Sequence, residues 1–208
     1  MEPAPRRTQA ERSAGTRALL VEAAVDTLVE RGWAATTAVA VCTRAGVTRG
    51  ALVHHFGGLP GLLAGALDHL YGELSARSEP APTLAGEIDR LWRAASDRRF
   101  KAVLEAWMAV GNDPVLAAEL APVVARFAEL MAPGERGAAA VAPGSEAEAA
   151  YLTAREAILG LALGRSVTGG WPLPHEARVL DELRARAAAL DTAPATTSDT
   201  GPSRGGRP

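Results

Sequence analysis

Apolar residues recur at three- and four-residue spacing along most of the chain, which is the period of an amphipathic helix. The alternating β-branched pattern of strands does not occur at useful length. We therefore predict an all-α protein. The predicted helices span residues 16–31, 37–45, 48–56, 59–76, 84–97, 98–111, 114–131, 145–168 and 174–190.

Residues 36–56, TTAVAVCTRAGVTRGALVHHF, have the pattern of two short helices joined by a glycine turn. Gly46 suits the left-handed conformation that ends a helix, and Thr48 offers a hydroxyl cap to the next helix. Leu52 and Phe56 lie on one face of that second helix and are expected to be buried. This arrangement is the helix-turn-helix that reads DNA, although an ordinary helical hairpin has the same outline.

The charge of the chain is distributed unevenly, although its formal net charge is only −2 over 208 residues. Residues 1–60 contain seven arginines and five acids, a formal charge of +2, whereas the remainder carries −4. A mildly basic head on an acidic body is typical of a DNA-binding domain joined to a body that does not contact DNA. The hydrophobic content of 48% is enough for a packed core and excludes a wholly disordered chain.

Several classes of site are not expected. No apolar run reaches the roughly 18 residues of a membrane span, and the N-terminus lacks a signal peptide's apolar block. We therefore predict a cytoplasmic protein that does not bind a membrane. Cys42 is the only cysteine and is expected to be buried, which excludes intrachain disulfides and multi-cysteine zinc sites. His54 and His55 diverge by about 100° on a helix and cannot chelate one ion efficiently. We expect no metal and no cofactor.

Residues 16–75 resemble the DNA-binding head of the TetR family of transcriptional regulators. The resemblance rests on the order Leu20-x-x-Ala23-Ala24-x-x-x-Leu28, Gly32-Trp33, Thr36-Thr37, Ala45-Gly46-Val47-Thr48-Arg49-Gly50, Leu52, His54-His55-Phe56 and Leu62-Leu63. It implies a three-helix helix-turn-helix head on a larger C-terminal helical body that binds an effector and dimerises. It also implies a dimeric, ligand-responsive regulator that binds a palindromic DNA operator, with repression relieved by a small molecule as the default.

The resemblance and the composition together suggest a division of the chain. The Pro-rich segment 78–83 separates the head from the body, and the last residues lack apolar anchors. The expected parts are a disordered basic arm (1–15), the DNA-binding domain (16–58), a connecting helix (59–78), the ligand-binding and dimerisation domain (79–191) and a disordered tail (192–208).

The family resemblance, carried over residue by residue, implies a DNA-binding set. Arg49 is the expected base reader, because a guanidinium in the first turn of a recognition helix can pair bidentately with guanine. Val53 stands where the family usually has Tyr, and Leu59 where it usually has Lys, so we expect weaker and less salt-sensitive binding. The full set is Thr36, Thr37, Arg44, Thr48, Arg49, Gly50, Ala51, Val53, His54 and His55.

Large side chains in the body suggest a pocket for an apolar or aromatic effector, although core packing explains most of them. The candidate lining residues are Leu67, Trp92, Leu104, Trp107, Met108, Phe127, Met131, Tyr151, Arg155 and Ile158. Two apolar stripes in 145–168 and 174–190 would pair with their symmetry mates as a four-helix bundle, unless they are simple intramolecular core. The candidate homodimer interface comprises Ala154, Leu161, Ala162, Arg165, Leu180, Leu183 and Ala187.

Two other classes of function remain open. An all-helical enzyme is not expected, because the chain contains no Gly-rich phosphate loop, nucleophile elbow or helical zinc motif. A TetR-like co-regulator with weak or lost DNA binding would act through protein partners, an alternative that Val53 and Leu59 make credible. Such a protein would show a flat salt dependence and no sequence preference.

Overall fold

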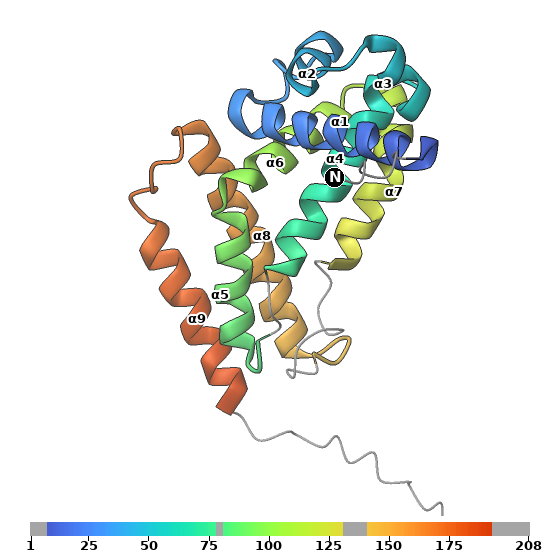
Figure 1. The fold of residues 1–208 in the computed structure, drawn as a ribbon. Helices are drawn as coiled ribbons and strands as arrows, with labels where there is room; N and C mark the ends of the chain where they lie inside the picture. Colours follow the sequence, from blue (N-terminus) through green and yellow to red (C-terminus); the bar gives the residue numbers. More distant parts are fainter. Residues whose placement is uncertain (1–7, 78–80, 131–140, 193–208) are drawn as a thin grey trace, which may run out of the picture.

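The computed structural model describes residues 8–77, 81–130 and 141–192, and every regular element in those ranges is an α-helix (Figure 1). This confirms the all-α prediction. The helices are α1 (Gln9–Arg31), α2 (Ala38–Ala45), α3 (Arg49–Phe56), α4 (Leu59–Ala76), α5 (Leu84–Ala95), α6 (Arg98–Val110), α7 (Pro114–Leu130), α8 (Glu146–Val167) and α9 (Glu176–Thr192). None of them is long and apolar enough to cross a bilayer.

The short helices α2 and α3 lie with α1 at one end of the molecule, and α4 leads from them into the body (Figure 1). In the body, α5, α8 and α9 pack against one another, while α4 packs against α7 and α1. The helix α6 runs beneath α1 and contacts it. Buried side chains of the head, such as Leu20 and Leu52, belong to the same hydrophobic core as Leu91 and Ile158 of the body.

The turn between α2 and α3 has the predicted local geometry. Gly46 ends α2 in the left-handed conformation, with φ 67° and ψ 29°, where a side chain would be strained. The Thr48 hydroxyl accepts the backbone N–H of Ala51 and caps α3. Gly57 then ends α3, and Pro60 lies in the first turn of α4.

The first helix is longer than predicted. It begins at Gln9, because Thr8 and Glu11 form a reciprocal capping box: the Glu11 N–H donates to the threonine hydroxyl, and its carboxylate accepts the Thr8 N–H at 2.7 Å. The prediction of a disordered arm over 1–15 is therefore wrong for residues 9–15. Residues 1–7 and 193–208 lie outside the described residues.

The other boundaries differ from the predicted ones by a few residues. The helix α5 ends at Ala95 rather than at residue 97, because the Asp97 side chain accepts the N–H of Arg99 and caps α6 instead. The last helix extends to Thr192, two residues beyond the predicted end.

Candidate nucleic-acid interface

The outward face of α3 presents an arginine, a glycine, a valine and a histidine to solvent. Arg49, Gly50, Val53 and His54 are exposed, whereas Leu52 is 1% exposed and anchors the helix to the core. On the inner side, the Arg17 guanidinium of α1 lies 4.8 Å from the centroid of the Phe56 ring and holds the end of α3. The predicted recognition residues therefore share one free face of a helix that is fixed from behind.

Two threonines begin the helix-turn-helix, and the structure separates their roles. The exposed Thr37 caps α2 by accepting the N–H of Ala40, which leaves its hydroxyl proton free for an outside acceptor such as a phosphate. Thr36 is 4% exposed and donates its hydroxyl proton to the Gly32 carbonyl at 2.8 Å. The prediction that the Thr36 side chain contacts DNA is wrong, because that hydroxyl is buried and already bonded.

Arg44 is ion-paired with α1 rather than free. Its two terminal nitrogens donate to the Glu30 carboxylate at 2.7 and 2.8 Å, and Asp26 lies 3.2 Å away. The guanidinium that donates to Glu30 holds the pKa of that carboxyl below its ordinary value. A phosphate would have to compete with two carboxylates for this cation.

Releasing Arg44 is expected to change the salt dependence of DNA binding. In an Asp26→Asn, Glu30→Gln variant, we expect the logarithmic salt slope to steepen by about 0.9, the value of one added phosphate contact. Fluorescence anisotropy at several salt concentrations measures this slope. The same two changes in an Arg44→Ala background are the control. An equal steepening there would show that the lost carboxylates act by themselves and that Arg44 gains no phosphate.

The adjacent histidines meet edge to face, with ring centroids 5.1 Å apart and an interplanar angle of 70°. His54 is exposed and His55 is half-buried. Among the described residues, no three His, Cys, Asp or Glu side chains are grouped to hold a metal ion.

The helix-turn-helix has a counterpart in known proteins. Residues 20–64 match the family model described as bacterial regulatory proteins, tetR family. HTH-type transcriptional regulator CymR of Pseudomonas putida is 32% identical over 119 residues, which is 57% of this chain and 59% of CymR. The helix-turn-helix segment of this chain is therefore similar to that of TetR-family regulators.

Solved structures extend the likeness of fold to the body. The multidrug binding protein EbrR has a TM-score of 0.66 at 23% identity, covering 93% of this chain and 100% of EbrR. A transcriptional regulator from Rhodococcus sp. Rha1 has a TM-score of 0.63 at 23% identity, covering 86% and 99%. The chain matches about three fifths of the length of CymR, and the family model matches residues 20–64 only.

In the body of the chain, four aromatic rings from α4, α6 and α7 meet. Phe127 lies 4.6 Å from Tyr71, 4.8 Å from Trp107 and 6.2 Å from Phe100, between ring centroids. The Trp107 indole N–H donates to the Tyr71 hydroxyl at 3.2 Å, and burial raises the pKa of Tyr71 to about 12. Leu67, Leu104, Tyr151 and Ile158 of the predicted lining set are likewise buried.

Three other members of the predicted lining set lie elsewhere. Met108 is 63% exposed because it lies on the outer side of α6, so its assignment to an interior pocket is wrong. Trp92 stacks under the Arg165 guanidinium at 4.9 Å, and Arg155 pairs with its neighbour Glu156 at 2.7 Å. Met131 lies outside the described residues.

Most of the predicted dimer interface faces inward. Among those residues, Ala154, Leu161, Ala162, Leu180 and Ala187 are at most 4% exposed, because α8 and α9 pack on each other and on α5. A second protomer cannot reach these side chains, so their assignment to the interface is wrong. Leu183 is half-buried in the same core.

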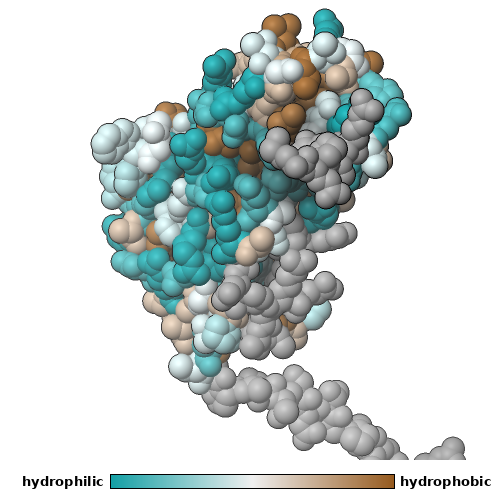
Figure 2. Space-filling model, in the orientation of Figure 1, coloured by the Kyte–Doolittle hydropathy of each residue, from teal (hydrophilic) through white to brown (hydrophobic). Residues whose placement is uncertain are grey.

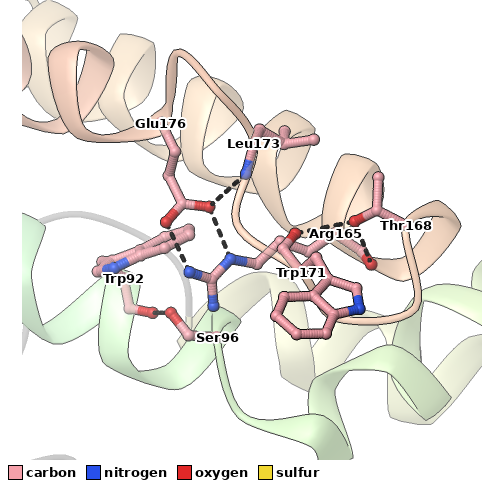
Figure 3. Close-up of polar contacts among 7 residues, drawn as sticks. All are labelled: Trp92, Ser96, Arg165, Thr168, Trp171, Leu173 and Glu176. Atoms are coloured by element: carbon pink, nitrogen blue, oxygen red, sulfur yellow. Dashed lines mark hydrogen bonds and ion pairs between the residues drawn. The ribbon is translucent and has the colours of Figure 1, made fainter.

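Arg165, another residue of the predicted dimer interface, instead forms an ion pair within its own chain (Figure 3). It donates twice to Glu176, at 2.6 Å each, which lowers the pKa of that carboxyl, and Glu176 also accepts the N–H of Leu173 at 3.4 Å. The Thr168 hydroxyl donates to the Trp171 carbonyl at 2.8 Å. These bonds fix the α8–α9 corner and hold Trp171, which is 76% exposed.

Sequence reasoning missed a polar link between head and body. The Glu105 carboxylate of α6 accepts the backbone N–H of Trp33 at 2.6 Å, directly after α1. Gly32 makes room for it, since a Cβ there would meet that carboxylate at 3.0 Å. Lys101 lies 3.3 Å from the same carboxylate. The two partners are 72 residues apart, so no local pattern indicates this contact.

Proposed function

We propose that this chain is a dimeric, ligand-responsive transcriptional regulator that binds a palindromic operator with α3 and releases it when a small molecule enters the body. The observation that carries the proposal is the free face of α3, where Arg49 and His54 are exposed on a helix anchored by Leu52. In a helix-turn-helix this face enters the major groove. We assign DNA binding to residues 16–58, the connection to 59–78, and ligand binding and dimerisation to 79–191.

The dimer surface is assigned to the outward stripe of α8 and the corner that follows. Leu163 is 42% exposed, Val167 is 81% exposed and Trp171 is 76% exposed, while Leu159 extends the stripe by one turn. Gly160 is exposed and has open space where a side chain would be, which permits close approach of a second helix. Large exposed apolar side chains gathered on one side are typical of an interface, and a twofold axis would pair this stripe with itself.

The effector is proposed to bind among the buried aromatic side chains of α4, α6 and α7. Tyr71 and Trp107 supply a polar pair within otherwise apolar surroundings, a combination that favours aromatic or apolar molecules. The structural neighbour EbrR was crystallised with imidazole, which supports a small-molecule effector for a body of this fold. Trp107 lies on α6, and so does Glu105, whose carboxylate accepts the backbone N–H of Trp33.

This shared helix offers a route from effector to DNA. Movement of α6 when a ligand separates Trp107 from Tyr71 would displace Glu105, which is bonded to the segment between α1 and α2. Ligand binding would then favour the arrangement of heads that does not match DNA, and DNA would favour the ligand-free body by the same coupling free energy.

Removing the Glu105 acceptor is expected to loosen the head. In Glu105→Ala we expect the Trp33 amide to exchange with solvent about tenfold faster or more, since the lost bond involves a charged group. Hydrogen exchange followed by NMR measures this. Glu105→Gln, which keeps an acceptor oxygen, should exchange more slowly than the alanine variant, and Lys101→Ala should leave the amide unchanged. Equal protection in all variants would mean that this bond does not hold the head.

Selection of genomic fragments by the purified full-length chain, followed by footprinting, tests the proposed function. We expect a palindromic site with half-sites about 34–36 Å apart, one turn of DNA. Recovery of no preferred sequence, together with a flat salt dependence, would favour the co-regulator that acts through protein partners.

A further inference from the structure

We propose that Val53 reads the 5-methyl group of a thymine in the operator, beside the base that Arg49 contacts. The inference rests on the proposed DNA binding and names a specificity-determining residue for it. Figure 2 shows hydrophobic residues at the end of the molecule formed by α2 and α3, where Val53 is 50% exposed and Val39 is 69% exposed.

Position along α3 places Val53 on the DNA-facing side. It follows Arg49 by four residues and Gly50 by three, so the three residues lie on one face of the helix. Its own helix turns Leu52 into the core, which fixes the orientation of the neighbouring residue outward. The exposed half of the Val53 surface can therefore contact the same DNA groove that Arg49 enters.

Gly50 has no side chain that projects from the face shared by Arg49 and Val53. A Cβ at this position would meet only the Thr48 hydroxyl at 3.7 Å, an ordinary contact, so internal packing does not require glycine there. The backbone is helical, which does not require glycine either. The missing side chain gives a base edge room to approach between Arg49 and Val53.

The chemistry of the major groove selects the partner. Guanine offers two acceptors to an arginine, and the thymine methyl is the one apolar group on a base edge there. Four residues of helix rise about 6 Å, close to two base-pair steps of about 3.4 Å. The geometry points to a thymine within about two base pairs of the guanine read by Arg49.

A protein partner fits this face less well. On the exposed side of α3, the residues near Val53 in sequence are Arg49 and His54, both polar, and the other exposed valine of this end, Val39, lies on α2. Docking surfaces for proteins are contiguous apolar patches of several hundred Å². One valine between polar groups suits a single methyl contact instead.

Uracil substitution tests the assignment, because uracil is thymine without the methyl group. The thymines of one half-site in the selected operator are replaced by deoxyuridine one at a time. Anisotropy with the full-length chain gives the dissociation constant of each duplex. For wild type we expect one position near the Arg49 base pair to lose about fourfold, the contribution of one buried methyl-sized group. Val53→Ala should bind the thymine and uracil operators equally at that position.

Val39→Ala is the matched control, since it removes the same groups from an exposed valine on α2, the helix that crosses the backbone. It should keep the wild-type fourfold ratio. The inference is overturned if uracil weakens binding of Val53→Ala as much as it weakens binding of wild type, or if no thymine of the half-site is sensitive to uracil. Either result leaves the proposed DNA binding intact. Failure to bind any DNA overturns the proposed function as well. Thermal unfolding of both variants is the check on stability, and we expect both to unfold as wild type does because the two valines are exposed.

Discussion

Arg49→Ala is expected to weaken binding to the selected operator by about 1–3 kcal/mol, or roughly 5- to 150-fold, and to relax preference at one base pair. The reason lies in the first turn of α3. Arg49 is exposed, and no described residue competes for its guanidinium, in contrast to Arg44, which Glu30 and Asp26 hold. Both N–H groups needed for a bidentate contact with guanine are therefore available.

Binding to a panel of operators, each changed at one base pair, measures the effect. The alanine variant should lose discrimination at a single position and keep it elsewhere. Arg44→Ala is the matched control, and we expect a smaller loss that is uniform over the panel, because its cation is already neutralised. An equal loss for Arg49→Ala on every sequence would show that Arg49 contacts a phosphate and not a base.

Val167→Glu is expected to convert the dimer into a monomer without unfolding the chain. Within one protomer Val167 is 81% exposed at the end of α8, so a carboxylate there remains hydrated and stability should be unchanged. In an isologous dimer both copies of the residue enter the interface, and each buried unpaired charge costs roughly several kcal/mol. The dissociation constant of the dimer should rise by about 100-fold or more.

Sedimentation velocity at micromolar concentration distinguishes the two species. Wild type should sediment at twice 21.5 kDa and the variant at 21.5 kDa. Val115→Glu, a change at a 67% exposed valine on α7, is the matched control and should remain dimeric. A dimer that persists in Val167→Glu would place the interface elsewhere. A monomeric wild type that still binds a palindrome would contradict the dimer proposal itself.

Local rules predicted the head because its signals are local. Gly46, Thr48 and the buried Leu52 lie within seven residues, and each acts through its own turn or helix face. The missed start of α1 is local as well, since Thr8 and Glu11 have the spacing of a capping box. The resemblance covered the same segment, and the family model matches residues 20–64 of it.

The body was harder to predict because an apolar stripe on a helix does not show whether it packs within the same chain or against a second protomer. The stripe of Ala154, Leu161 and Ala162 is apolar at helical spacing, but α5 and α9 of the same chain cover it. The less hydrophobic opposite side, with Leu163 and Val167, remains exposed. Contacts such as Arg44 with Glu30, and Glu105 with Trp33, join distant turns and leave no periodic trace.

The central claim is sequence-specific DNA binding through α3, and an anisotropy titration tests it most directly. The full-length chain is titrated against the selected palindrome and against a scrambled duplex of equal length, at about 0.15 M salt. We predict that the palindrome binds at least about 10³-fold more tightly, with one dimer per duplex. Equal affinity for both duplexes would contradict the account.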